Sequence, residues 1–238
     1  MSTNQAARPP TANRILGALP DEEYARLDPH LMPVTLGLRQ IINKPHEPIT
    51  HVYFPENAMI SLVANTSDGA SVEVGVVGRE GVAGVPALLG VDATPNESMV
   101  QIADGALKMR AEVARAEFKR GGVFQDLVLR YVQANTVQIS QTALCNRVHS
   151  VEERLARWLL MTRDRAASDE LMMTQEFLSM MLGCRRSGVT DAAITLQADG
   201  YINYRRGHIT ITDGPGLEGA SCECYAVVTA EYARVLKV

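Results

Sequence analysis

Residues 174–197 are TQEFLSMMLGCRRSGVTDAAITLQ, and this stretch decides the fold. Thr174 is a favourable helix N-cap, and apolar residues follow it at helical spacing, at Phe177, Leu178 and Met181. Gly183 ends this helix, because glycine reaches left-handed backbone angles that other residues resist. The stretch therefore predicts a first short helix that stops in a tight glycine turn.

A second helix follows the turn and is polar and basic at its start. Two short helices joined in this way describe a helix-turn-helix, which places the first residues of its second helix against base edges in the DNA major groove. A helical hairpin in an ordinary core would show the same two helices. We expect an inner face of Val189, Ala193, Ile194 and Leu196, and a DNA-facing start of Arg185, Arg186, Ser187 and Thr190.

The residues after the second helix favour DNA binding over a plain hairpin. Residues 201–204 alternate in strand fashion, Arg205-Arg206-Gly207 makes a turn, and residues 208–212 alternate again. This pattern predicts a β-hairpin with a basic tip at Arg205 and Arg206. A hairpin directly after the recognition helix is typical of a winged helix, whose tip contacts phosphate. We also expect Thr174 and Gln175, at the start of the first helix, to donate to phosphate.

The C-terminal third resembles the Crp/Fnr-type transcription regulators. The residues that carry this resemblance are 151–160 (VEERLARWLL), 171–174 (LMMT), 183–187 (GCRRS) and 200–202 (GYI). The resemblance implies an α+β fold with an N-terminal effector-sensing β-roll similar to cyclic-nucleotide-binding domains, a long dimerisation helix and a C-terminal winged helix. It divides the chain into residues 12–122, 123–149 and 150–238 respectively, and implies a homodimer that binds a pseudo-palindromic duplex, with RNA polymerase as a further candidate partner.

Composition bounds these expectations. A chain of 238 residues with 46% hydrophobic residues suits one large or two ordinary globular domains. No run of eighteen or more apolar residues is present, so no membrane association is expected. Residues 1–11 lack the apolar centre of a signal peptide and predict a disordered arm. Because the net charge is −4, any DNA-binding surface must come from a local cluster, and the four arginines above supply one.

The four cysteines lie in the second half of the chain and include no CxxC pair. This pattern favours a reducing, cytoplasmic compartment, and the absence of any cysteine before Cys145 argues against an iron–sulfur cluster. Cys222-Glu223-Cys224 suggests metal binding or oxidation only weakly, so we expect no metal and leave the role of these two cysteines open. His30, His46 and His51 are available as haem ligands, but lone loop histidines are usually solvated or hydrogen-bonded.

Residues 34–109 contain short alternating runs separated by turn residues, which predict an antiparallel β-roll or small barrel. The expected strands are 34–36, 52–54, 59–63, 72–77, 98–102 and 106–109. Short helices are expected over residues 13–27, with a second turn starting at Pro20, and over 113–118. A further helix, over residues 217–236, is expected to pack on the winged helix or on the roll.

The candidate effector pocket lies around residues 78–84. Regulators of this family that bind cyclic AMP carry a Gly-Glu pair on a short helix and then an Arg with Ser or Thr on the next strand. Here Asn96 and Glu97 stand where the second pair is expected, and Glu97 would repel a phosphate. Cyclic AMP is therefore disfavoured, while cyclic-di-GMP, another small ligand or no ligand all stay open. The candidate pocket residues are Arg79, Glu80, Gly81, Val82, Asn96 and Glu97.

Residues 123–149 contain no proline or glycine and predict one helix about 40 Å long. Leu127, Tyr131 and Gln138 form one stripe of this helix, and Asn135 and Thr142 lie beside it. We predict these five residues as the coiled-coil seam of the dimer, with a plain core helix as the alternative. The chain has no Walker loop, HExxH motif or GxSxG elbow, so we expect no enzyme activity.

Overall fold

The computed structural model describes residues 10–236. The predicted N-terminal arm falls mostly on residues 1–9, outside this range. Two short helices, α1 (Arg14–Gly17) and α2 (Asp21–Leu27), take the place of the amphipathic segment expected there, with the 3-10 turn η1 (Asp28–His30) after them. The break falls at Pro20, which cannot donate a backbone hydrogen bond. The buried carboxamide of Asn13 caps α1 and donates to the carbonyl oxygens of Pro55 and Gly81, which ties the segment to the roll.

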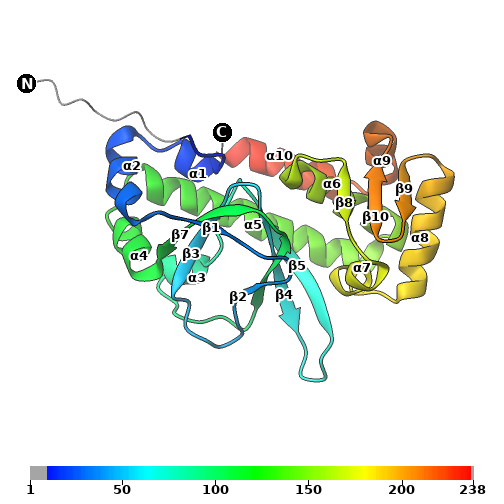
Figure 1. Cartoon of the computed structure of the whole chain (residues 1–238), viewed down its shortest axis with the longest axis horizontal. Coiled ribbons are helices and arrows are strands. Elements are labelled where there is room, and N and C mark those ends of the chain that lie inside the picture. The colour runs from blue at the N-terminus through cyan, green and yellow to red at the C-terminus, as the bar shows by residue number, and fades with distance from the viewer. Residues whose placement is uncertain (1–9, 237–238) are drawn as a thin grey trace, which may run out of the picture.

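Residues 32–110 form the predicted β-roll from two antiparallel sheets (Figure 1). One sheet has the order β1-β7-β3 and the other β2-β6-β4-β5. All six expected strands are present, and sequence inspection missed only the three-residue strand β2 and the short helix α3 (Val85–Leu88). The strands are β1 (Met32–Thr35), β2 (Ile41–Asn43), β3 (His51–Pro55), β4 (Met59–Asn65), β5 (Ser71–Val77), β6 (Glu97–Ile102) and β7 (Gly105–Arg110).

The helix α4 (Ala111–Lys119) follows the roll and leads into α5 (Val123–Val148), the predicted long helix. Gly121 and Gly122 separate the two with φ angles of +83° and +87°, which glycine adopts without strain. The carboxylate of Glu23 accepts hydrogen bonds from the backbone N–H groups of Val123 and Phe124, at 2.9 and 2.8 Å. These bonds satisfy the N-terminal donors of α5 and place α2 beside them.

The C-terminal part contains the predicted winged helix. The helix α6 (Val151–Ala166) begins with a capping box between Ser150 and Glu153. The sheet that contains the hairpin has a third strand that was not expected, β8 (Glu170–Met172), which pairs with β10 (His208–Ile211), the second strand of the hairpin. The remaining elements are α7 (Gln175–Leu182), α8 (Arg186–Ala198), β9 (Ile202–Arg205), α9 (Gly214–Ala220) and α10 (Cys224–Leu236).

The C-terminal helix expected over residues 217–236 is divided into α9 and α10. α9 packs on α6, whereas α10 turns back and lies along α5 (Figure 1). The rings of Tyr232 on α10 and Tyr131 on α5 are 6.4 Å apart and tilted. Neither of the two packing partners expected for this segment, the winged helix and the roll, is the main partner of α10. Its continuous apolar stripe is instead buried against the long helix.

This packing corrects the predicted dimer seam. Leu127, Tyr131 and Gln138 are buried within the chain, at 5%, 1% and 0% exposure, while Asn135 and Thr142 are half-buried beside them. The side of α5 that sequence inspection assigned to a second copy is therefore filled by the roll and α10 of the same chain. The amphipathic pattern identified a buried stripe correctly but could not identify what buries it.

A single hydrophobic cluster runs through the roll, α5 and the winged helix. Polar contacts join the same parts: the indole N–H of Trp158 donates to the buried Glu73 carboxylate at 2.9 Å, and Arg165 forms an ion pair with Glu80 at 2.7 Å. The winged helix is thus docked against the roll. Among residues 10–236, no helix is both long and apolar enough to cross a membrane.

Candidate nucleic-acid interface

The helix-turn-helix is built by α7 and α8. The hydroxyl oxygen of Thr174 accepts a hydrogen bond from the N–H of Phe177 and caps α7. Gly183 ends α7 with a φ of +58°, and a side chain there would also meet Val72 of the roll, because a Cβ atom at this position would lie 2.8 Å from the Val72 Cγ2. The turn needs glycine for both its backbone angle and its space. Arg154 on α6 donates to the carbonyl oxygen of Leu182 and holds the turn from inside.

The first turn of α8 presents the predicted base-reading residues to solvent. Arg185, Arg186 and Ser187 are exposed, while Thr190 is half-buried and donates its hydroxyl to the Arg186 carbonyl oxygen. Asp191 lies on the same open face and would exclude phosphate from that point. The N-terminal end of α8 therefore offers two guanidinium groups and a hydroxyl group to a groove.

One residue of α8 lies on the opposite side from the one expected. The buried side consists of Val189, Ala193 and Leu196, as predicted, together with Ala192. Ile194, predicted for the inner face, is 62% exposed. Successive residues of a helix are about 100° apart around its axis, so Ile194 points away from Val189 and Leu196. Ala192 occupies the inner position that was predicted for Ile194. The exposed side of α8 thus carries an apolar side chain, of a kind that can contact a thymine methyl group.

The wing brings its basic tip beside the start of α7. Arg205 pairs with His208 across the hairpin, so the loop consists of Arg206 and Gly207, with φ angles of +53° and +84°. Positive φ at both loop residues describes the tight turn that suits the twist of a hairpin. The backbone N–H of Met173 donates to the Gly207 carbonyl oxygen at 2.7 Å, which fixes the tip against the strand that precedes Thr174.

The wing is also tied to the recognition helix. The N–H of Tyr204 donates to the side-chain oxygen of Gln197 on α8, and its hydroxyl donates to the Met173 carbonyl oxygen at 2.9 Å. Burial raises the pKa of the Tyr204 hydroxyl, and the positive charge of Arg186 lies close enough to oppose that rise. These contacts hold the wing against α8 and against the residue before α7, the three elements that carry the predicted DNA-contacting residues: Arg185, Arg186, Ser187, Thr190, Thr174, Gln175, Arg205 and Arg206.

The predicted effector pocket is only partly formed by the expected residues. Val82 and Asn96 line a cavity of about 160 Å³ inside the roll. Glu80 is turned away from it and paired with Arg165. Arg79 is also engaged elsewhere, because it donates to the Arg165 carbonyl oxygen at 3.0 Å. Glu97 is not among the lining residues.

The environment of Gly81 favours an alternative interpretation of residues 78–84, as a tight turn of the roll with no ligand role. A Cβ atom at Gly81 would lie 2.2 Å from the ring of Tyr131, so the α5 aromatic ring occupies the space directly over this turn. The cavity walls are apolar apart from a few uncharged polar side chains: Asn43, Thr94, Asn96, Ser98, Tyr131 and Asn135. Within residues 10–236, no lysine or arginine lines the cavity to neutralise a phosphate.

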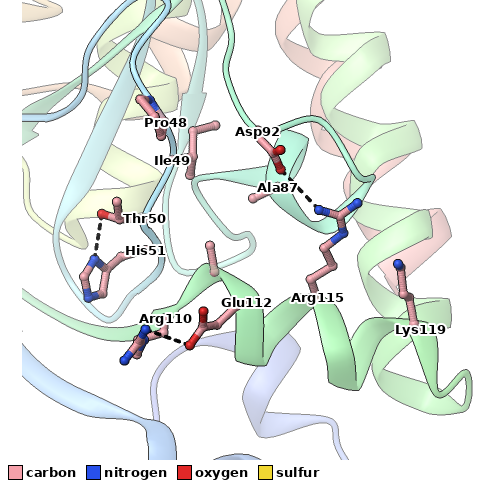
Figure 2. Close-up of a pocket in the computed structure, with 11 residues that line it drawn as sticks. Pro48, Ile49, Thr50, His51, Ala87, Asp92, Arg110, Glu112, Arg115 and Lys119 are labelled. Atoms are coloured by element: carbon pink, nitrogen blue, oxygen red, sulfur yellow. Dashed lines mark hydrogen bonds and ion pairs between the residues drawn. The ribbon is translucent and has the colours of Figure 1, made fainter.

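A larger hollow of about 810 Å³ opens on the outside of the roll, between the 48–51 loop, α3 and α4 (Figure 2). Four of the charged side chains that line it form two ion pairs, Arg110 with Glu112 at 2.7 Å and Arg115 with Asp92 at 3.2 Å (Figure 2). Burial, followed by the charge of Lys108 and then of Arg110, lowers the pKa of His51 at its edge. The hollow has charges but no converging set of them, and we assign it no site.

Sequence inspection identified only part of one further cluster. The structure brings Cys145 and His149, four residues apart near the end of α5, next to Cys222 and Cys224 from the α9–α10 junction. The CxC pair was visible, and a cysteine and a histidine at helical i, i+4 spacing were visible too. Nothing in the sequence indicated that these two pairs, more than 70 residues apart, would meet.

Comparisons with known proteins agree with this geometry. Residues 153–220 match a family model described as the Crp-like helix-turn-helix domain. No curated protein sequence matches the chain. A transcriptional regulator of the Crp/Fnr family from Eubacterium rectale has a similar structure, with a TM-score of 0.68 and 15% sequence identity over 87% of this chain and 96% of that one.

Two further structures have the same fold. The cyclic-di-GMP-responsive global regulator CLP of Xanthomonas campestris gives a TM-score of 0.65 and 16% identity over 81% of this chain and 99% of that one. FixK2 from Bradyrhizobium japonicum gives a TM-score of 0.66 and 16% identity over 81% of this chain and 98% of that one. The chain therefore carries a Crp-like helix-turn-helix domain on a Crp/Fnr-type fold, which confirms the resemblance and the fold class predicted from the sequence.

Proposed function

We propose that this chain, with its Crp-like helix-turn-helix domain, is a sequence-specific DNA-binding transcription regulator that acts as a homodimer. The observation that carries the proposal is the exposed start of α8, where Arg186 lies close to Tyr204 of the wing, together with a wing that is hydrogen-bonded to Met173 just before α7. Arg185, Arg186, Arg205 and Arg206 are all exposed, in a chain whose net charge is −4. A local basic surface of this kind suits a phosphate backbone.

Each residue on this surface has a role set by its position. Arg186 and Ser187 face outward from the first turn of α8 and are assigned to base edges, with arginine best suited to guanine. Arg185 and Thr190 flank them as base or phosphate contacts. Thr174 and Gln175 at the start of α7, and Arg205 and Arg206 on the wing, are assigned to phosphate.

The dimer seam is reassigned to the open side of α5. Leu129, Val132, Thr136, Ile139 and Ala143 follow one another at alternating steps of three and four residues, and none of them is buried in the chain. Leu129 and Ile139 are 46% and 36% exposed, which is unusual for large apolar side chains on one stripe. Such a heptad-spaced stripe suits a parallel two-helix seam with a second copy. The two recognition helices of that dimer would meet half-sites about 34 Å apart.

The roll cavity favours an uncharged small effector or none. Its volume of about 160 Å³ is below the usual range for small-molecule sites, and its lining within residues 10–236 carries no cation. Cyclic AMP therefore stays disfavoured. One structural neighbour is described as cyclic-di-GMP-responsive, and a second-messenger receptor remains our alternative; that ligand would need a binding place outside this cavity.

Selection from a randomised duplex pool tests the proposal. The full-length protein should enrich a palindrome, with or without added cyclic AMP or cyclic-di-GMP. Arg186→Ala should relax the preference at one base position and cost about 1–3 kcal/mol in specific binding. Arg206→Ala should weaken binding to all sequences and lower the salt dependence by about one phosphate contact. Arg120→Ala, at an exposed position on the roll side, is the matched control. An unchanged preference in Arg186→Ala would contradict the assignment.

A further inference from the structure

Four potential metal ligands converge where α5 ends. The Sγ atoms of Cys145, Cys222 and Cys224 and a ring nitrogen of His149 all lie within 4.8 Å of one another. The Cys145 and Cys222 sulfurs are 3.5 Å apart, and the Cys224 sulfur is 3.7 Å from His149 Nδ1. We propose that these residues form a structural zinc site.

The geometry suits zinc. A tetrahedral Zn²⁺ with bonds of about 2.3 Å to sulfur and about 2.0 Å to nitrogen places its ligand atoms roughly 3.5–3.8 Å apart. The four atoms already approach this spacing, so binding needs a contraction of at most about 1.3 Å between any two of them. Three cysteines and one histidine fill all four positions, as in structural rather than catalytic zinc sites. A thiolate-rich, four-coordinate set also selects zinc over magnesium or calcium.

The orientation of His149 is an independent observation that favours a metal. Its Nδ1 faces the Cys224 sulfur, while its Nε2 lies 3.2 Å from the carboxylate of Glu223. A ligating histidine typically donates its second ring N–H to a carboxylate in this way, which fixes the tautomer and the ring plane.

The surrounding charge fits the loaded site. Zn²⁺ with three thiolates and a neutral imidazole carries one net negative charge. Arg157 on α6 is 6% exposed, and its positive charge acts on Cys145 and Cys224. Its Nε has no hydrogen-bond partner among residues 10–236. The side chain of Glu223, which contacts His149, is 72% exposed, so the site borders solvent on this side.

The site joins two junctions between helices. His149 is the C-cap of α5, directly before the N-cap of α6, and Cys222 and Cys224 link α9 to α10. α9 packs on α6 of the winged helix, and α10 packs on α5. A bound zinc ion would hold the winged helix at a set angle to the long helix. This consequence, unlike the site itself, rests on the proposed DNA-binding function.

Metal analysis of the full-length chain, purified without a histidine tag, tests the site directly. We expect one zinc ion per chain by elemental analysis, with three of the four thiols protected from a thiol reagent until a chelator is added. Replacement by Co²⁺ should give the sulfur-to-cobalt charge-transfer band and the intense visible bands of a tetrahedral site.

Three variants locate the metal. Cys222→Ser should lose the zinc and the cobalt spectrum, whereas Cys184→Ser, which alters the cysteine of the helix-turn-helix turn, should keep both. Glu223→Gln keeps all four ligands and should weaken metal affinity about 10–100-fold. Because this variant changes only an exposed side chain, its result does not depend on the fate of the core.

Several results would overturn the inference. They are a metal-free chain with four freely reacting thiols, a Cys145–Cys222 disulfide in its place, or equal zinc content in Cys222→Ser. Because metal content is measured without DNA, it is independent of the proposed function. If a variant loses its zinc and still binds DNA normally, zinc does not hold the winged helix at the angle that DNA binding needs, but the site itself stands. If the chain carries zinc and selects no DNA sequence, only the regulator proposal is refuted.

Discussion

Replacing Arg165 by leucine should strongly destabilise the docking of the winged helix on the roll. Arg165 and Glu80 each expose 8% of their side chains and are joined by a 2.7 Å ion pair. The same guanidinium donates to the Gln138 side-chain oxygen at 3.0 Å and to the Met161 carbonyl oxygen at 2.9 Å. The leucine variant leaves the Glu80 carboxylate buried without its partner. Breaking one side of such a pair costs about 3–5 kcal/mol.

The assay is urea unfolding followed by the fluorescence of Trp158, the single tryptophan, which lies at the same interface. In a parallel thermal melt of a chain of this size, the same loss corresponds to a fall in Tm of roughly 6–20 °C. Arg120→Leu breaks an ion pair whose arginine is 62% exposed, and it should cost about 0–1 kcal/mol. The double variant Glu80→Leu/Arg165→Leu should recover most of the loss, because no buried charge is left unpaired. If Arg165→Leu unfolds within about 1 kcal/mol of the parent chain, the buried pair does not hold this interface.

Three further predictions concern other parts of the molecule. Burial raises the pKa of Glu73 from an ordinary 4.5 to about 7, so its protonated form favours the folded state. Its contribution to stability is therefore full below pH 4.5 and is lost as the pH rises through about 7, by about 1.4 kcal/mol per unit of pKa shift. The free energy of unfolding, measured across that pH range, should depend less on pH in Glu73→Gln than in the parent chain. An identical slope in the two proteins would contradict this. Ile139→Lys should sediment as a monomer, because it places a charge in the proposed seam of the dimer. Val227→Lys on α10 is the control: its parent residue is 40% exposed, against 36% for Ile139, and the variant should stay dimeric. A dimeric Ile139→Lys would rule out the seam. Gly81→Ala should lower the free energy of unfolding by about 1–3 kcal/mol, because its Cβ would collide with the Tyr131 ring, and an unchanged melting curve would disprove that contact.

The local features were accessible from the sequence because short-range physics determines them. Thr174 and Gly183 bound α7 as predicted, since capping and left-handed backbone angles depend on the residue and its immediate neighbours. The alternating runs of the roll and the basic hairpin tip followed from period and turn residues in the same way. The residues assigned to DNA contact come from the start of α7, the start of α8 and the hairpin tip, and each of these elements was predicted from its local sequence.

The errors arose where a pattern shows that a face is buried but not what covers it. Leu127 and Tyr131 were assigned to a second copy and are covered by the same chain, because α10 turns back onto α5. Ile194 was assigned to the buried face of α8, where Ala192 lies instead. Glu80 was placed toward a ligand and is held by Arg165, from a helix 85 residues away in sequence.

The sequence by itself thus determined the elements, their order and the winged-helix surface, since each depends on interactions within a few residues. Only the tertiary structure decided which side of α5 is left open, how small and uncharged the roll cavity is, and that Cys145 and His149 meet Cys222 and Cys224. These outcomes depend on contacts between segments far apart in the chain. Such contacts form only when the packing of the whole core selects them, and no local pattern records that choice.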